Sequence, residues 1–307
     1  MDLQGKKVIV FGGAGFIGYN LCNALWARGA EVTVFDRSVV PTRKDMRCIQ
    51  GDFFDDEQLK RAVQGQDMLV HAICTINPGL SITDYMRGYE KDFVQSARLC
   101  DLAYQSGKRL LFLSSGGTVY AGKRTPLQED DPKEPINHYG SLKLCVEDMM
   151  QAFIHAGADF RIARIANAYG PGQDYRKGVG FIDAAIKKAL NHEPIEIWGD
   201  GSIVRDYIYI DDICHMLCDV LAYDGTDRIM NIGTGKGVSQ HEIIEMLRQC
   251  LGDVDVRYLS ARSIDRQNLV LDTARYEHHF AFRPRSIRCG LNAYMAWLQH
   301  CSSPNTM

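Results

Sequence analysis

Short apolar runs alternate along the first half of the chain with segments in which apolar residues recur every three or four positions. The first run, Val8 to Phe11, leads through glycines into Tyr19 to Arg28, where Leu21, Leu25 and Trp26 have helical spacing. An apolar, β-branched run ending in glycines is typical of a buried parallel strand, and the spacing after it predicts a helix. Similar runs recur at Glu31 to Phe35, Met68 to Ile73, Arg109 to Leu113 and Phe160 to Ile165. The pattern predicts an α/β fold with a Rossmann-type, doubly wound parallel sheet.

Past Asn167 the alternation stops at the turn Gly170-Pro171-Gly172-Gln173, and shorter strands and helices follow. We therefore predict two domains, residues 1–166 and residues 167–307, the second being a smaller mixed α/β unit. Segments near residues 206–235 are expected to return to the first sheet.

Bulk composition excludes several classes of protein. The chain has 307 residues, and its 35 basic and 38 acidic residues give a formal net charge of −3, which does not indicate a nucleic-acid surface. Its ten cysteines form no zinc-like pairs, so no metal site is expected. The polar start lacks the apolar core of a signal peptide, and no apolar run is long enough to cross a membrane. The sequence therefore predicts a reduced cytoplasmic protein without membrane contact.

Several glycines lie in the first strand-to-helix connection. Gly12 permits a tight turn, Gly15 lets the backbone approach a diphosphate, and Gly18 lets the helix pack closely on the strand. The N–H groups and dipole of the helix N-terminus favour a bound anion. Residues 1–166 are accordingly predicted to bind a dinucleotide.

Two acids follow at spacings that suit the rest of such a cofactor. Asp36 ends the second strand, where a carboxylate binds the ribose 2′-OH of NAD and repels the 2′-phosphate of NADP. The adjacent Arg37 weakens that preference, because an arginine can accept the phosphate. Asp52 has two interpretations, either a contact to adenine or an N-cap for a helix over Asp55 to Val63.

Tyr139 and Lys143 lie four residues apart on a predicted helix, so they share a face. An ammonium beside a phenol favours the phenolate, and we expect Lys143 to lower the pKa of Tyr139 from its usual value of about 10. Tyr139 would then serve as the acid or base that oxidation of an alcohol by NAD requires. Ser114 to Thr118 follow a strand end, where their hydroxyls could hold the reacting hydroxyl of a substrate.

These features together resemble the extended short-chain dehydrogenase/reductases, in the NAD-dependent nucleotide-sugar epimerase/dehydratase group, and within it most closely the UDP-glucose 4-epimerases. The resemblance spans nearly the whole chain and is more specific for the superfamily than for the substrate. The matching segments are GGAGFIG (Gly12 to Gly18), Asp36, Gly51-Asp52, VHA (Val70 to Ala72), SSGGTVY (Ser114 to Tyr120), YGSLK (Tyr139 to Lys143), RIANAYGPGQ (Arg164 to Gln173), IWGDGSIVRDYIYIDD (Ile197 to Asp212) and NIGTG (Asn231 to Gly235).

The resemblance implies a role for each matching position. The residues it implies for the NAD diphosphate and neighbouring cofactor atoms are Gly12, Gly15, Phe16, Ile17, Gly18, Arg37 and Ala72. It implies that Asp36 binds the adenosine ribose, Asp52 and Phe53 the adenine, and Tyr139 and Lys143 the nicotinamide ribose. On the substrate, it implies Asn167 for a phosphate or sugar, Trp198 for stacking on the base, and Arg205 and Arg262 for the diphosphate. Core packing for Trp198 and surface ion pairs for the two arginines are the alternatives.

The chain departs from the family pattern at two positions. Gly116 stands where these epimerases carry a catalytic Ser or Thr, so Ser115 or Thr118 would have to supply that hydroxyl. Asp92 stands where the family often has an asparagine beside the nicotinamide site; an acid there would change the local field, unless the loop alignment is shifted.

The resemblance implies a UDP-hexose 4-epimerase that works through a transient 4-keto sugar. The alternatives are an NAD(P)H-dependent nucleotide-sugar 4-ketoreductase and a non-catalytic NAD-binding sensor, which would usually lack the Tyr/Lys pair. A 4,6-dehydratase is disfavoured, because Gly117-Thr118 replaces the Asp-Glu of that group. Leu269 is expected near the position that gates N-acetyl groups. A homodimer formed through helices near Asp92 to Gln105 and His138 to Phe153 is also implied.

Overall fold

Seven parallel strands form the main sheet of the computed structural model, which describes residues 1–38, 43–78, 83–120, 125–174, 176, 180–260 and 268–302. Their order in the sheet is β10-β6-β5-β4-β1-β2-β3. The strands are β1 (Lys7–Phe11), β2 (Glu31–Asp36), β3 (Arg47–Gln50), β4 (Met68–His71), β5 (Arg109–Ser115), β6 (Phe160–Ile165) and β10 (Ile229–Ile232). The predicted Rossmann-type fold is confirmed.

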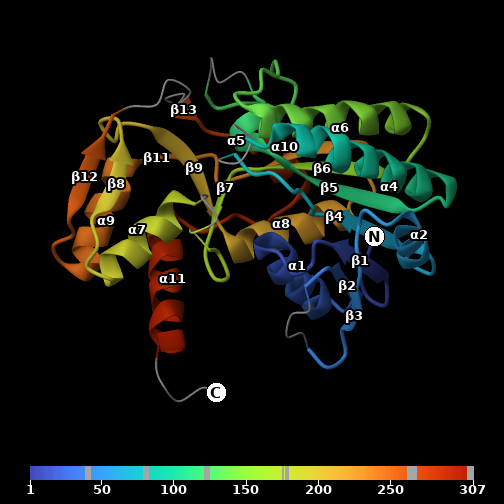
Figure 1. Ribbon diagram of the computed structural model, residues 1–307, viewed down its shortest axis with the longest axis horizontal. Helices are drawn as coiled ribbons and strands as arrows, with labels where there is room; N and C mark the ends of the chain where they lie inside the picture. The colour runs from blue at the N-terminus through green and yellow to red at the C-terminus, as the bar shows by residue number, and fades with distance from the viewer. Residues whose placement is uncertain are drawn as a thin grey trace.

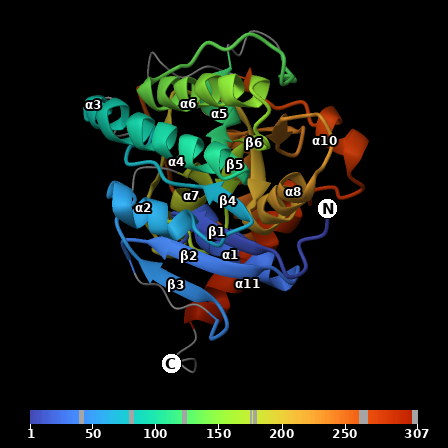
Figure 2. The same ribbon diagram turned by 90° about the vertical axis from the view of Figure 1, so that its right-hand side faces the viewer.

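Helices cover both faces of this sheet, as Figures 1 and 2 show. On one face α1 (Phe16–Ala27) packs against α8 (Ile210–Ala222), and on the other lie α2 (Asp56–Val63), α4 (Val94–Gln105) and α6 (His138–His155). Side chains of a strand alternate between the two faces, so Val8 and Val10 join one core and Ile9 and Phe11 the other. This two-sided burial explains why the strands read as continuous apolar runs.

The helical segment from Tyr85 to Gln105 is divided into three parts. It consists of α3 (Tyr85–Arg87), a π-helical stretch η2 (Gly88–Phe93) and α4. A π-helix holds more residues per turn, so helical periodicity alone does not reveal it. The buried Asp92 lies in this stretch.

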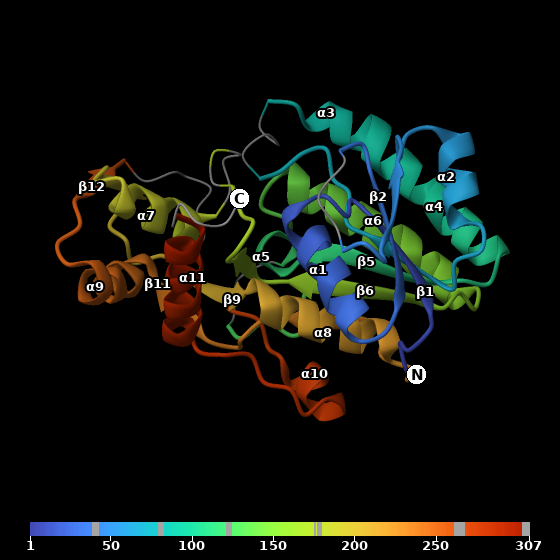
Figure 3. The ribbon, with the colours of Figure 1, turned by 90° about the horizontal axis from the view of Figure 1, so that it is seen from below.

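Shorter strands form two smaller sheets in the second half of the chain (Figure 3). One contains β7 (Asn167–Tyr169), β9 (Val204–Tyr209), β11 (Gly237–Ser239) and β13 (Asn268–Leu269), and the other pairs β8 (Ile195–Trp198) with β12 (Val256–Leu259). The helices of this half are α7 (Phe181–Leu190), α9 (Gln240–Leu251), α10 (Ala274–His279) and α11 (Ile287–Ser302). Within the described residues, we find no helix with the length and apolar character needed to span a membrane.

The chain returns from the second half to the main sheet. β10 pairs in parallel with β6, with Ile229 opposite Ile162. In contrast, β9 pairs with β7, β11 and β13 in the smaller sheet. Residues at the carboxyl ends of β1, β4, β5 and β6 line one cavity together with residues of β8 and β9, and the candidate site lies there.

Candidate active site

The glycine turn after β1 is held by main-chain contacts. Gly12 has a φ of 87° and donates its N–H to the Phe35 carbonyl at 2.9 Å. A Cβ on Gly18 would lie 2.1 Å from the Gly12 carbonyl oxygen, so this position tolerates no side chain without movement of the loop. α1 begins at Phe16, and its N-cap Gly15 offers no side-chain cap, so the N–H groups of the first turn are left for a ligand.

Asp36 lies beside this turn at the end of β2. Its carboxylate accepts hydrogen bonds from the N–H groups of Ala14 and Ser38, each at 3.1 Å. The side chain of Arg37 is exposed, and its carbonyl accepts a bond from Gln50. A carboxylate is thus fixed next to the anion-binding end of α1.

Asp52 and Phe53 are occupied locally. Asp52 accepts the N–H of Phe54 at 3.0 Å, whereas the N-cap of α2 is Asp55, so the interpretation of Asp52 as N-cap is wrong. Phe53 is buried against Phe11 and His71. Any contact of this turn with adenine would therefore involve the Asp52 carboxylate or the main chain, because the Phe53 ring lies in the core.

A single cavity of about 950 Å³ runs from the glycine turn to the smaller sheets. The predicted site residues that line it are Gly12, Gly15, Phe16, Ile17, Gly18, Ala72, Ser115, Thr118, Tyr139, Lys143, Asn167, Trp198 and Arg205. Arg262 lies outside the described residues. The cavity brings together residues from both halves of the chain, as a site for a cofactor and a second ligand requires.

Lys143 is buried one helical turn after Tyr139 on α6. Its ammonium donates to the Leu113 carbonyl at 2.9 Å and lies 5.7 Å from the centroid of the Tyr139 ring. The helix begins next to Tyr139, because the Asn137 side chain accepts the N–H of Gly140 at 2.8 Å. The start of α6 and the end of β5 are thereby joined.

Burial raises the pKa of Tyr139, and the adjacent Cys74 thiol raises it further. The prediction of a Tyr139 pKa below its usual value is therefore wrong for the protein without ligands. Removing the phenolate from water is the largest cause of this shift, and the Lys143 ammonium is hydrogen-bonded to the Leu113 carbonyl. A further positive charge in the cavity would favour the phenolate.

The hydroxyls beside Tyr139 differ in their surroundings. Ser115 is half-buried, whereas Thr118 is buried and its Oγ1 has no hydrogen-bond partner among the described residues. A Cβ on Gly116 would meet the Leu271 side chain at 2.6 Å, so that position faces the core. An unpartnered buried hydroxyl in the cavity favours Thr118 as the group that bonds a ligand.

Asp92 supports the cavity wall from η2. Its Oδ2 accepts bonds from the N–H and the hydroxyl of Thr75, at 2.7 and 3.0 Å, next to the cavity-lining Cys74. Its Oδ1 is buried without a hydrogen-bond partner among the described residues. The acid therefore holds the loop after β4 near Lys143.

The far end of the cavity presents side chains from short strands. Trp198 and Glu196 lie on the same face of β8, and Glu196 pairs with Lys188 of α7 at 3.1 Å. The Asn167 side chain donates to the Asp206 carbonyl at 2.9 Å. Arg205 lies next to Asp206 on β9. Leu269 is buried on β13 opposite Arg205 and is not among the described lining residues.

Several lining residues were not identified from the sequence. Cys74, Lys188 and Glu196 line the cavity but belong to none of the motifs in the sequence. Only Glu196 carried a usable signal, because it lies two residues before Trp198 and residues two apart in a strand point to the same face.

Comparisons with known proteins agree with this geometry. A family model described as the NAD dependent epimerase/dehydratase family matches residues 8–233. The chain is 28% identical to a UDP-glucose 4-epimerase of Halalkalibacterium halodurans (97% of this chain, 96% of the relative) and 28% identical to a dTDP-4-dehydro-6-deoxyglucose reductase of Escherichia coli (94% and 100%). The Thermus thermophilus UDP-glucose 4-epimerase in complex with NAD superposes with a TM-score of 0.86 at 26% identity, covering 95% of this chain and 98% of that one.

Proposed function

Because the chain belongs to the NAD dependent epimerase/dehydratase family, whose cofactor is NAD, we propose that it is a UDP-hexose 4-epimerase that works through a transient 4-keto sugar. The observation that carries the proposal is the single cavity that joins the glycine turn, the Tyr139–Lys143 pair and the Trp198–Arg205 end. A cofactor and a nucleotide sugar would meet at Tyr139.

The residues at the cofactor end fit NAD. The turn leaves no room for a side chain at Gly18, and α1 presents uncapped N–H groups to a diphosphate. Asp36 would bind the adenosine ribose, and Tyr139 and Lys143 would bind the nicotinamide ribose. The cofactor held by these residues would supply reversible hydride transfer at C4 of the sugar and, when oxidised, a positive charge on its nicotinamide ring.

Tyr139 moves the proton in the proposed reaction. In the phenolate form it takes the proton of the C4 hydroxyl. After the 4-keto sugar has rotated about its bond to the diphosphate, so that the opposite face of C4 is reduced, Tyr139 returns the proton to the C4 oxygen. Lys143 and a positive charge bound in the cavity favour that phenolate against the effect of burial. Thr118, with its unpartnered hydroxyl, holds the reacting oxygen.

The far end holds the nucleotide while the hexose turns. The indole of Trp198 suits stacking on a pyrimidine, and the guanidinium of Arg205 suits bonds to the diphosphate. Arg262 would add a second cation. Firm contacts to the nucleotide, with few to the hexose, would permit the rotation.

The test is incubation of the purified protein with UDP-glucose, UDP-GlcNAc and related sugars without added cofactor. Interconversion of 4-epimers, followed by NMR, is the expected result, because the reaction has no net redox change and NAD stays bound. Tyr139→Phe should lower kcat by at least about 100-fold, as loss of an acid–base group does, while NAD remains bound. Full activity of this variant would contradict the proposed mechanism.

One alternative is favoured by a specific observation. The Escherichia coli relative is a reductase of similar identity, and a 4-ketoreductase would use the same Tyr139 and Lys143. Turnover of a 4-keto sugar only with added NADH or NADPH would identify that activity. Absence of both reactions across the panel would favour a non-catalytic NAD-binding sensor.

We also propose a homodimer formed through α4 and α6. These helices pack side by side, with the rings of Tyr104 and Phe153 at 5.6 Å, and Val94 and Tyr104 on α4 remain exposed. Light scattering after gel filtration should give twice the chain mass, and a monomer at micromolar concentration would contradict the proposal.

A further inference from the structure

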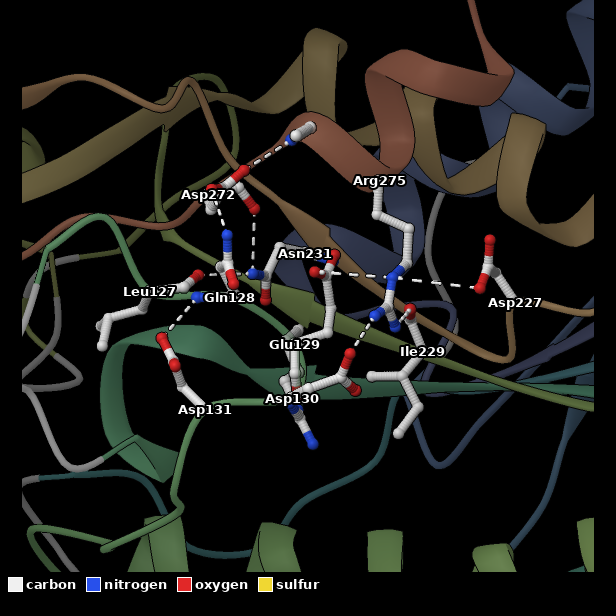
Figure 4. Close-up of polar contacts among 12 residues, drawn as sticks. Leu127, Gln128, Glu129, Asp130, Asp131, Asp227, Ile229, Asn231, Asp272 and Arg275 are labelled. Atoms are coloured by element: carbon white, nitrogen blue, oxygen red, sulfur yellow. Dashed lines mark hydrogen bonds and ion pairs between the residues drawn. The ribbon is translucent and has the colours of Figure 1, made fainter.

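Asn231, in the NIGTG segment, lies where three segments of the chain meet (Figure 4). Its amide group donates to the carbonyls of Leu127 and Asp272, at 2.8 and 3.0 Å, and its Oδ1 accepts the Tyr120 hydroxyl at 2.6 Å. Its main-chain N–H donates to the Glu129 carboxylate at 2.8 Å. Since both amide protons and the side-chain oxygen are used, this fully buried residue has a single orientation.

Arg275 of α10 also binds the other two segments of this junction. Its guanidinium donates to the Asp130 carboxylate at 2.6 Å and to the Ile229 carbonyl at 3.2 Å, as Figure 4 shows. Gln128 adds a bond to Asp272 at 3.3 Å. The loop before α6, strand β10 and the segment after β13 are therefore bound to one another.

From Tyr120 the hydrogen bonds continue inward to an ion pair. The hydroxyl accepts from Arg164 Nη1 at 2.9 Å, and Arg164 donates to Glu147 through Nη2 at 2.6 Å and through Nε at 3.0 Å. Both charged side chains are 1% exposed. Glu147 also accepts the hydroxyl of Ser114 at the end of β5.

Glu147 lies four residues after Lys143 and eight after Tyr139, so the three share a face of α6. Lys143 bonds the Leu113 carbonyl, and Glu147 bonds the next residue, Ser114. Successive residues of β5 are thus tied to successive turns of α6, directly before the cavity-lining Ser115.

Stability is a weak explanation for such a pair. Two buried charges lose their hydration, and their attraction often only repays that cost. A fixed separation between α6 and β5, in contrast, directly determines where Tyr139 and Lys143 lie relative to Ser115 and Thr118.

We propose that Glu147 and Arg164 are positioning residues for Tyr139 and Lys143, and that Tyr120 and Asn231 connect them to the segment after β13. β13 pairs with the strand that carries Arg205, so the connection links the substrate end of the cavity to the proton-transfer group. This inference rests on the proposed function for the identity of the reaction.

The test compares three variants that remove one group each. Glu147→Gln keeps the shape and removes the charge opposite Arg164, and Tyr120→Phe removes the hydroxyl that joins Arg164 to Asn231. The control is Tyr276→Phe, which removes an equally buried hydroxyl that donates to Asp219 at 2.5 Å outside this network. Melting temperature, NAD affinity by calorimetry, kcat and KM are measured for each.

We expect Glu147→Gln to lower kcat and to weaken NAD binding about tenfold each, with KM for the sugar within threefold, because the nucleotide contacts lie at the far end. Tyr120→Phe should change the same quantities about threefold. Tyr276→Phe should lower the melting temperature while leaving kcat and NAD affinity unchanged.

Retained kcat and NAD affinity in both network variants, with only a lower melting temperature, would show that the network is merely structural. If Glu147→Gln does not fold, the positioning role is tested by comparing kcat and NAD affinity between Tyr120→Phe and Tyr276→Phe. If the wild-type protein epimerises no sugar, the proposed function is wrong, and NAD affinity still tests the positioning role.

Discussion

The two ends of the cavity are made from different parts of the polypeptide. At the cofactor end, the cavity is lined by the Gly12–Gly18 turn and the start of α1, whose main-chain groups would bind the cofactor. At the substrate end, the cavity is lined by side chains such as Trp198 of β8 and Arg205 of β9, which belong to the two smaller sheets. The difference implies that adding a side chain at the cofactor end weakens NAD binding. At the substrate end, removing a side chain weakens binding of the nucleotide sugar.

Gly18→Ala should give the largest effect on the cofactor end. The added Cβ would lie 2.1 Å from the Gly12 carbonyl oxygen, so the turn must move, and we expect NAD affinity to fall more than about 100-fold. Binding of UDP, measured in the same calorimeter, should not change. Gly117→Ala is the control, since its Cβ would meet Asn167 only at 3.6 Å. Equal losses in both variants would contradict the comparison.

Arg205→Met should act on the opposite end. Loss of a charge-assisted bond to a diphosphate costs about 1.5–3 kcal/mol, so KM for the nucleotide sugar should rise about 10- to 100-fold while NAD affinity stays the same. Lys188→Met is the matched control, because its ammonium already pairs with Glu196. A fall in NAD affinity with Arg205→Met would mean that the two ends are not separable.

The buried His71 should make the free energy of unfolding fall at acid pH. Burial, assisted by the charge of Lys143, lowers the pKa of His71 to about 3. Between pH 3 and the ordinary value near 6.5 the unfolded chain binds the extra proton, so stability falls as the pH drops, by about 1.4 kcal/mol at pH 5.5. Urea unfolding at pH 7.5 and 5.5 measures the difference, which His71→Asn should reduce.

The control for that measurement is His192→Asn. His192 is exposed and has a φ of 57°, a conformation that asparagine also adopts. The same reduction in both variants would contradict the role of burial.

Thr118→Val should give the smallest effect, at the junction of the two ends. Loss of one hydrogen bond to the reacting oxygen predicts a kcat lower by about threefold to tenfold, with NAD affinity unchanged. Ser115→Ala should change kcat by less than twofold. The reverse ranking would identify Ser115 as the hydroxyl that replaces the missing one at Gly116.

The parts of the fold that were predictable are those with a local cause. β1, β2 and β4 are largely apolar runs bounded by turns, and the glycine at 18 is explained by its close approach to the main chain of Gly12 within the same turn. The π-helical stretch and the short strands β7, β11 and β13 have too little periodicity to be identified. Their positions depend on pairing with segments far away in the sequence.

The identity of the site residues could be predicted from the sequence, but the direction of the Tyr139 pKa shift could not. Tyr139 and Lys143 are four apart in any helix, yet the sign of the Tyr139 pKa shift depends on how deeply the cavity buries the phenol. The carbonyl that holds the Lys143 ammonium comes from β5, thirty residues earlier. The Glu147–Arg164–Tyr120–Asn231 connection joins four distant segments, and no spacing rule indicates it.

The insertion of β10 beside β6 has an evolutionary consequence. A chain that exchanged everything after residue 166 for the second half of another enzyme would also replace β10 and α8, and so lose an edge strand of the main sheet and the helix that packs on α1. Recombination that seeks a new sugar specificity therefore has to preserve residues 210–232 while it replaces the sequence on either side. Diversification of this architecture is expected to proceed by point changes and loop exchange rather than by swapping a contiguous cassette.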